Sequence, residues 1–207
     1  MAGTVKEARL GLADKALRLF ARGMVAVVQR PVLYGPKPVL DQPTIFACRH
    51  MGLMDPVILM TRYPDIMIRP LAATDYVYKN SFTKSFFTHA QAIPIDRTNR
   101  SKQWLEDSLA ALSKGESIII YPEGRRNKTG KGLLPFHVGV SMLAAHSGAR
   151  IIPVYNCMWN FPHRYRLAIG EPFHIDKMPE EGLTPEWLRA QTDRVQAAVA
   201  ALESRFQ

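Results

Sequence analysis

Residues 44–55 read TIFACRHMGLMD, a short apolar run followed by a histidine and, five positions after the histidine, an aspartate. The run from Thr44 to Cys48 is typical of a buried strand. Asp55 precedes Pro56, and an aspartate followed by proline is typical of an N-cap with proline in the first helical turn. The segment therefore predicts that His50 and Asp55 lie in a turn between a strand and a helix.

A histidine held by a carboxylate can act as a general base near neutral pH. The strand end would hold His50 rigidly, and Asp55 can reach the ring nitrogen that faces away from a substrate. Asp55 would then set the tautomer of the ring and stabilise the imidazolium that forms when His50 takes a proton from an alcohol. In the alternative interpretation Asp55 only caps the helix and His50 is an ordinary strand-end residue.

Three further apolar segments have the pattern of short strands. They are residues 91–97 (QAIPIDR), residues 117–126 (SIIIYPEGRR) and residues 151–155 (IIPVY). The first ends with Arg97, and the apolar part of the second is followed by Glu123 and Arg126. Ligands of α/β sheets bind at the ends of strands. We therefore expect these charged side chains to share one site with His50 and Asp55.

These four segments, in this order, resemble the four motifs of the glycerolipid acyltransferase family, whose best-known members acylate 1-acylglycerol-3-phosphate or glycerol-3-phosphate. The first motif, Asn-His-x-Ser-x-x-Asp, is matched by His50 and Asp55, with Arg49 and Gly52 in place of the asparagine and the serine. The second, Gly-x-Ile-x-Ile-Asp-Arg, is matched up to Arg97. The resemblance covers about residues 44–155, half of the chain.

The third and fourth motifs complete the resemblance. The third, Pro-Glu-Gly-Thr-Arg-Ser, is matched by Pro122, Glu123, Gly124 and Arg126, and the fourth, a valine-proline-valine type strand, by Ile152, Pro153 and Val154. The chain departs from the family pattern at four further positions, which are Gln91 for glycine, Arg125 for threonine, Asn127 for serine and His137 for a frequent lysine. These departures bear mainly on the identity of the acyl acceptor.

The resemblance implies a single-domain α/β fold with a mixed, mostly parallel sheet flanked by helices. It implies an O-acyltransferase of phospholipid biosynthesis that moves a fatty acyl group from acyl-CoA or acyl-carrier protein to the hydroxyl of a lysophospholipid. The implied acceptor is 1-acylglycerol-3-phosphate and the product is phosphatidic acid. His50 would be the general base and Asp55 its orienting partner. Neither a metal nor a cofactor is expected, because the acyl thioester is a co-substrate.

The resemblance also implies a substrate-binding set, which consists of Arg97, Glu123, Gly124, Arg126 and Pro153. Arg97 and Arg126 suit a phosphate, since a guanidinium binds its oxygens in bidentate fashion. Glu123 would accept a hydrogen bond from the acceptor hydroxyl or orient an arginine, and its structural alternative is an ion pair that closes the loop. Gly124 would supply the backbone freedom of the turn.

Other functions stay open at this point. The same chemistry could act on glycerol-3-phosphate, another lysophospholipid or an acylated amino-acid lipid. A non-catalytic lipid-binding or carrier-binding protein could retain the same fold. Cys48 lies two residues before His50, on the same face of a strand, so a Cys–His nucleophile pair is a further alternative.

Composition limits the class of protein and its partners. With 207 residues, 47% hydrophobic and 22% charged, the chain is expected to be one globular domain, residues 1–207. Two cysteines are too few for a disulfide framework and indicate a reducing compartment. A net charge of +9 favours anionic partners such as an anionic membrane surface, a phosphorylated substrate or an acidic carrier protein. No nucleic-acid-binding motif accompanies this charge, so no nucleic acid is expected as a partner.

Residues 1–30 are predicted to contain an amphipathic helix. Its apolar residues recur at helical spacing at Leu17, Phe20, Met24, Val27 and Val28. This run is too short to cross a bilayer, and nothing at the start resembles a signal peptide. The helix could lie in a membrane interface or pack on the sheet of its own domain. We expect a cytoplasmic protein, peripheral at the inner membrane surface.

The remaining elements frame the motif-bearing core, residues 44–155. A helix is predicted over residues 102–113 with Ser101 as its cap, a last strand at the sheet edge within residues 159–173, and a C-terminal helix over residues 184–206. Pro94 and Pro153 are predicted to lie at strand ends or on edge strands. Aromatic residues at 76–89 form either core or an acyl-chain groove.

Overall fold

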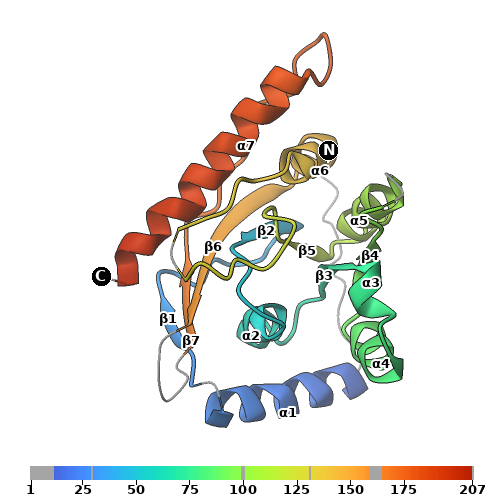
Figure 1. Cartoon of the computed structure of the whole chain (residues 1–207), viewed down its shortest axis with the longest axis vertical. Helices are drawn as coiled ribbons and strands as arrows, with labels where there is room; N and C mark the ends of the chain where they lie inside the picture. The colour runs from blue at the N-terminus through green and yellow to red at the C-terminus, as the bar shows by residue number, and fades with distance from the viewer. Residues whose placement is uncertain (1–11, 29, 99–100, 131, 159–164, 207) are drawn as a thin grey trace.

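The computed structural model describes residues 12–28, 30–98, 101–130, 132–158 and 165–206, and within them seven strands form one sheet (Figure 1). The strands are β1 (Val32–Tyr34), β2 (Thr44–Cys48), β3 (Ile68–Ala73), β4 (Ile93–Ile95), β5 (Ser117–Ile120), β6 (Arg150–Met158) and β7 (Tyr165–Ile169). Their order is β1-β7-β6-β2-β5-β3-β4, and only the β6–β7 pair is antiparallel. The predicted mixed, mostly parallel sheet is confirmed.

Helices cover both faces of this sheet (Figure 1). They are α1 (Leu12–Val28), α2 (Asp55–Arg62), α3 (Thr74–Val77), α4 (Ser81–His89), α5 (Gln103–Ser113), α6 (Gly139–Ser147) and α7 (Pro185–Ala200), which continues as a 3₁₀ helix, η1 (Ala201–Phe206). The predicted C-terminal helix is confirmed, with Thr184 as its N-cap. The predicted helix at 102–113 is confirmed from Gln103 onward, but its N-cap is Lys102 and not the predicted Ser101. The Ser101 hydroxyl lies one residue earlier and accepts a hydrogen bond from the Gln103 amide.

Strand β2 lies at the centre of the core because its side chains alternate between the two layers of helices. Ile45 and Ala47 pack with residues of α5, α6 and α7. Phe46 and Cys48 pack on the opposite face with residues of α2. A strand buried on both faces needs a continuous apolar sequence, which is why this segment was recognisable from its pattern.

Two of the proline and edge predictions are corrected by the sheet order. Pro94 lies in β4, an edge strand, as predicted. Pro153 lies inside the sheet in β6, so its prediction is wrong. The Pro153 carbonyl accepts a hydrogen bond from the Gly170 amide, just beyond the last residue of β7. The nitrogen of Pro153, which has no hydrogen to donate, therefore faces a stretch where regular pairing with β7 has ended.

The predicted last strand, β7, is one position inside the edge of the sheet, and β1 occupies the edge itself. Residues 159–164 of that prediction lie outside the described residues.

Strand β3 has no counterpart in the sequence prediction. It contains Arg69 and Pro70, which weaken its strand pattern. The strand tolerates Pro70 because this residue lies where the pairing changes. β3 pairs with β5 up to Pro70 and with β4 from Leu71 onward. The strand leads directly into α3, which brings residues 74–77 to the site described below.

Helix α1 packs with one face and exposes the other. Val25 is buried with Ile58 of α2 and Tyr165 of β7. Phe20, Met24 and Val27 are 70%, 48% and 73% exposed, so these predicted apolar positions do not pack on the sheet. The side chains of Leu17 and Val28, and residues 1–11 and 29, lie outside what the structure describes. Within the described part of the chain, α1 and every other helix fall short of the length and apolarity that a membrane crossing requires.

Candidate active site

The turn after β2 holds His50 against Asp55. His50 Nδ1 lies 2.8 Å from Asp55 Oδ2, and Asp55 is buried while the imidazole is partly open to solvent. The carboxylate also accepts from the backbone amides of Met51, at 2.6 Å, and Gly52, at 3.0 Å. The predicted pairing of His50 with Asp55 is therefore present.

The predicted N-cap role of Asp55 is wrong. Helix α2 starts at Asp55, and its N-cap is Met54, which makes no side-chain cap hydrogen bond. The carboxylate instead folds back over the turn, because two turn amides and the imidazole all point toward it. The interpretation in which Asp55 only caps the helix is thereby excluded by geometry.

Tyr121 covers one face of the imidazole. The two ring centroids are 4.1 Å apart with an interplanar angle of 28°. Asp55 occupies Nδ1, and no hydrogen bond among the described residues occupies Nε2 of His50. Because His50 lines the pocket, this is the nitrogen available to a substrate.

Cys48 does not support the alternative of a Cys–His nucleophile pair. Its side chain is buried in the core on the α2 side, where Sγ contacts the Phe46 carbonyl. Burial, and the Asp55 charge after it, raise the pKa of the Cys48 thiol well above its usual value. A thiol in these surroundings is a poor nucleophile.

Arg49, which stands in place of the family's asparagine, points into the protein. The side chain is fully buried and donates to the carbonyls of Asn156 and Gly132, each at 2.8 Å. The Asn156 amide in turn donates to the Arg49 carbonyl at 2.7 Å. These hydrogen bonds fix the backbone just before His50. Arg49 therefore has a structural role and does not form part of the pocket wall.

Glu123 supports the backbone of His50. Its Oε1 accepts from the His50 amide at 2.9 Å, and its Oε2 accepts from Asn127 Nδ2 at 2.9 Å and from the Leu134 amide at 2.8 Å. Only 2% of the residue is exposed. The predicted contact to a substrate or an arginine, and the alternative ion pair, do not fit this geometry. Asn127, which replaces the family's serine, also donates its backbone amide to the His50 carbonyl at 2.7 Å.

Gly124 occupies a conformation that other residues rarely adopt. Its φ is +66°, and a Cβ at this position would lie 2.8 Å from the His137 ring. The predicted need for backbone freedom is therefore confirmed. Its carbonyl accepts a hydrogen bond from Arg97 Nη1 at 3.2 Å, which ties the second and third motifs together.

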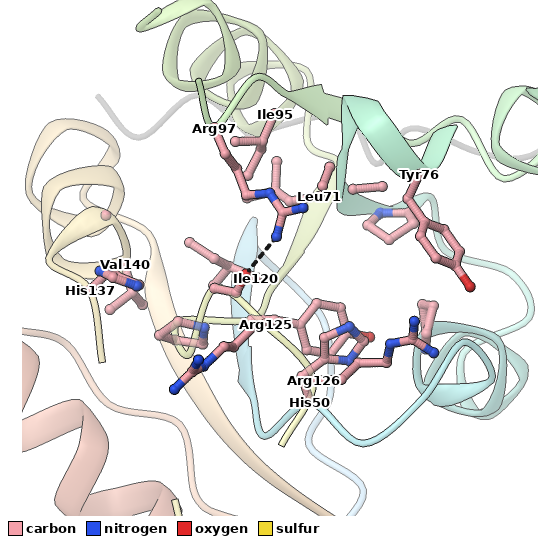
Figure 2. Close-up of a pocket in the computed structure, with 18 of the residues that line it drawn as sticks. His50, Leu71, Tyr76, Ile95, Arg97, Ile120, Arg125, Arg126, His137 and Val140 are labelled. Atoms are coloured by element: carbon pink, nitrogen blue, oxygen red, sulfur yellow. Dashed lines mark hydrogen bonds between the residues drawn. The ribbon is translucent and has the colours of Figure 1, made fainter. Parts of the chain in front are cut away.

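Arg97 lines the pocket but is already paired. Its Nη2 donates to both carboxylate oxygens of Asp75, at 2.8 and 2.7 Å. Arg126 lies with its Cζ 5.2 Å from the centre of the Tyr76 ring. Arg125 and Arg126 are exposed and pair with no carboxylate among the described residues. Figure 2 shows Arg97 on one side of the pocket and Arg126 beside His50 on the other.

The pocket that these residues surround has a volume of about 1470 Å³. Its apolar wall includes Leu71, Phe87, Ile95, Trp104, Ile120 and Val140. Tyr76 and Phe87 belong to the aromatic segment 76–89 and both line the pocket. Of the two interpretations of this segment, core or groove, the groove fits these two residues. The cavity is larger than the roughly 300–1,000 Å³ of common ligand sites and suits a long apolar group. Among the described residues, no three His, Cys, Asp or Glu side chains are placed to hold a metal ion.

Pro153 is separated from this pocket. Its ring packs against Gly170, where an added Cβ would lie 2.7 Å from Pro153 Cγ. The predicted membership of Pro153 in the substrate-binding set therefore does not fit the structure. The fourth motif supports β6 next to β2, so its part in the site is structural.

Sequence reasoning missed four residues of the site. They are Asp75, Tyr121, Asn127 and Tyr165. Tyr121 follows the end of β5, which is a usable signal, and Asn127 follows the third motif. Asp75 follows β3, whose strand pattern is weak. Tyr165 hydrogen-bonds Asp55 from 110 positions away and belongs to no motif, so no local pattern could have found it.

Known proteins resemble this chain over the segments that form the site. The family model described as "Acyltransferase" matches residues 23–156. The 1-acyl-sn-glycerol-3-phosphate acyltransferase of Cocos nucifera is 28% identical over 136 residues, which cover 64% of this chain and 43% of that protein. The human 1-acyl-sn-glycerol-3-phosphate acyltransferase alpha is 25% identical over 163 residues, covering 75% of this chain and 56% of that protein. The chain thus spans about half the length of these curated relatives.

A solved structure supports the fold. The 1-acyl-sn-glycerophosphate (LPA) acyltransferase PlsC from Thermotoga maritima superimposes with a TM-score of 0.62 at 19% identity, covering 95% of this chain and 84% of that chain. The family model covers more than half of the chain, and its range contains all four motif segments. The chain belongs to the glycerolipid acyltransferase family.

Proposed function

We propose that this chain transfers a fatty acyl group from an acyl thioester, either acyl-CoA or acyl-carrier protein, to the hydroxyl of 1-acylglycerol-3-phosphate, giving phosphatidic acid. The observation that carries the proposal is the His50–Asp55 pair at the wall of a large apolar pocket that also presents three arginines. The names of the relatives support the same acceptor.

The dyad supplies the base that this reaction needs. His50 Nε2 takes the proton of the acceptor hydroxyl while the hydroxyl oxygen attacks the thioester carbonyl carbon. The carbon–sulfur bond then breaks, and the departing thiolate takes the proton back from the imidazolium. Asp55 keeps the proton on Nδ1 and stabilises the transient imidazolium. No covalent acyl-enzyme is required.

The arginines suit the phosphate of the acceptor. Asp75 already pairs with the guanidinium of Arg97 through Nη2, so phosphate binding would exchange one anion for another. Arg125 and Arg126 are free of such a partner within the described part of the chain. Their charge would attract the phosphate toward the His50 side of the pocket (Figure 2).

Arg97→Ala is expected to raise KM for 1-acylglycerol-3-phosphate about tenfold to a hundredfold, because a hydrogen bond to a charged group contributes about 1.5–3 kcal/mol. The KM for an acceptor without phosphate should stay the same. The measurement uses purified protein, a labelled acyl thioester and a panel of lysophospholipid acceptors with and without phosphate. The matched control is Arg189→Ala, which removes a similarly exposed ion-paired arginine from α7 outside the pocket. An equal loss with both acceptor types would contradict a phosphate role for Arg97.

The same panel separates the alternative functions. Glycerol-3-phosphate, other lysophospholipids and an acylated amino-acid lipid test other acceptors of the same chemistry. A protein that binds lipid or carrier without transfer, and whose binding is unaffected by His50→Ala, would be the non-catalytic alternative. Testing acyl-CoA against acyl-carrier protein identifies the donor.

The proposal places the chain at the inner membrane surface, on its cytoplasmic side, through helix α1. Its exposed face carries Phe20, Met24 and Val27, which recur at helical spacing and can enter the headgroup region of a membrane. The net charge of +9 acts in the same direction.

Replacing Phe20 and Val27 by serine is expected to weaken binding to anionic vesicles at least tenfold, because each large apolar side chain contributes about 1.5–3 kcal/mol when fully buried. The measurement is co-sedimentation with phosphatidylglycerol-containing vesicles. Val39→Ser is the matched control, since Val39 is 77% exposed but lies outside α1. If the double variant bound vesicles as tightly as the wild-type protein, α1 would be excluded as the membrane-binding element.

A further inference from the structure

Tyr165 holds the side of Asp55 that His50 does not touch. Its hydroxyl donates to Asp55 Oδ1, while Asp55 Oδ2 faces His50 Nδ1. The two carboxylate oxygens thus have different principal partners. Tyr165 is the first residue of β7 and lies far from the motif in sequence.

The ring of Tyr165 is fixed by packing. It belongs to a buried cluster with Val25 of α1 and Ile58 of α2. The backbone of Tyr165 is paired with Met158 of β6. Held by a strand and wedged between two helices, the ring aims its hydroxyl at one place.

The hydroxyl stays protonated and therefore acts as a donor. Burial, and the charge of Asp55 after it, raise the pKa of Tyr165 well above its usual value. Besides His50 and Tyr165, Cys48 of β2 and Tyr121 after β5 interact electrostatically with Asp55, and burial is the main cause that raises the pKa of each. Cys48, Tyr121 and Tyr165 are therefore all neutral at physiological pH. Of these three groups, Tyr165 is the one that hydrogen-bonds the Asp55 carboxylate directly.

We propose that Tyr165 is a positioning residue for the dyad: its hydroxyl orients the Asp55 carboxylate toward His50 and draws part of the carboxylate's negative charge away from the imidazole. The expected effect on rate rests on the proposed acyl transfer, whereas the effect on the hydrogen bonds of Asp55 does not depend on it. A merely structural Tyr165 would only fill the space between α1 and α2.

Tyr165→Phe keeps the ring and removes the donor. Without the hydroxyl, Asp55 attracts the imidazolium more strongly, so the base holds its proton up to a higher pH. We expect kcat to fall about tenfold with little change in KM, and the midpoint of the acid limb of kcat/KM to move up by about half a pH unit. A loss of packing alone would lower activity without moving this midpoint.

A second readout needs no substrate. The Nδ1 proton of His50, shared with Asp55, gives a downfield NMR resonance that can be assigned by its loss in His50→Ala. Tyr165→Phe is expected to move this resonance further downfield, because the carboxylate becomes a stronger acceptor. If the wild-type protein transfers no acyl group, the proposed function fails, and this resonance still tests Tyr165.

Tyr63→Phe is the matched control. Tyr63 is equally buried, its hydroxyl has no partner among the described residues, and it does not line the pocket. The resonance and the acid limb should stay unchanged in this variant. Should Tyr165→Phe fail to fold, Val25→Ala loosens the ring but keeps the hydroxyl, and we expect the same shifts at smaller size. A resonance and an acid limb that remain at their wild-type positions would overturn the inference.

Discussion

His50→Ala is expected to lower kcat/KM for acyl transfer about a hundredfold to ten-thousandfold, which is the usual contribution of general-base catalysis. The free energy of unfolding should change little. Asp55 Oδ2 keeps its hydrogen bonds from the Met51 and Gly52 amides after the imidazole is removed, so no buried carboxylate is left unpaired. The effect is therefore on the base and not on the turn that presents it.

The measurement is initial-rate kinetics with a saturating acyl thioester, together with urea unfolding followed by circular dichroism. His174→Ala is the control, because His174 is exposed and does not line the pocket. Retained activity in His50→Ala would exclude this imidazole as the base. Activity lost together with folding would show that the turn depends on it.

Glu123→Ala is expected to lower the free energy of unfolding by about 3 kcal/mol or more. The substitution leaves three donors without an acceptor in a buried place: the amides of His50 and Leu134 and the side chain of Asn127. Each unsatisfied buried donor costs about 1–3 kcal/mol. Glu123→Gln should fall between wild type and alanine, because one of its two acceptor positions becomes an NH₂ group facing a donor.

This prediction separates the observed role of Glu123 from the role that the motif suggested. If Glu123 contacted substrate, its removal would change KM and leave the free energy of unfolding in urea unchanged. A carboxylate that holds the His50 backbone lowers stability and activity together. Glu171→Ala, which removes an exposed carboxylate outside the pocket, should change neither quantity.

The site was predictable wherever its geometry depends on neighbours in the chain. His50 and Asp55 are five positions apart in one turn, so their pairing needs only the local strand-to-helix pattern. Gly124 was predictable for the same reason, because the demand for a positive φ arises within its own turn. Arg97 was correctly placed at the pocket because it follows a recognisable strand.

Roles that depend on partners far along the chain were not predictable. Glu123 follows a strand end as a binding residue would, yet its partner His50 lies 73 positions away and draws the carboxylate inward. Arg97 has the expected position, but Asp75, 22 positions away in the chain, already pairs with its guanidinium. Pro153 belongs to the fourth motif, but the sheet order places it away from the cavity.

By itself the amino-acid sequence determined the α/β class, the buried central strand, the family and the histidine–aspartate pair. These depend on hydrophobic periodicity and on spacing within one turn, which short stretches of chain contain in full. Tertiary structure alone decided that Glu123 binds the His50 backbone, that Arg97 is already paired with Asp75 and that Tyr165 hydrogen-bonds Asp55. Such assignments depend on strand order and on contacts between distant segments, and a side chain's partners are set only when the folded sheet brings those segments together.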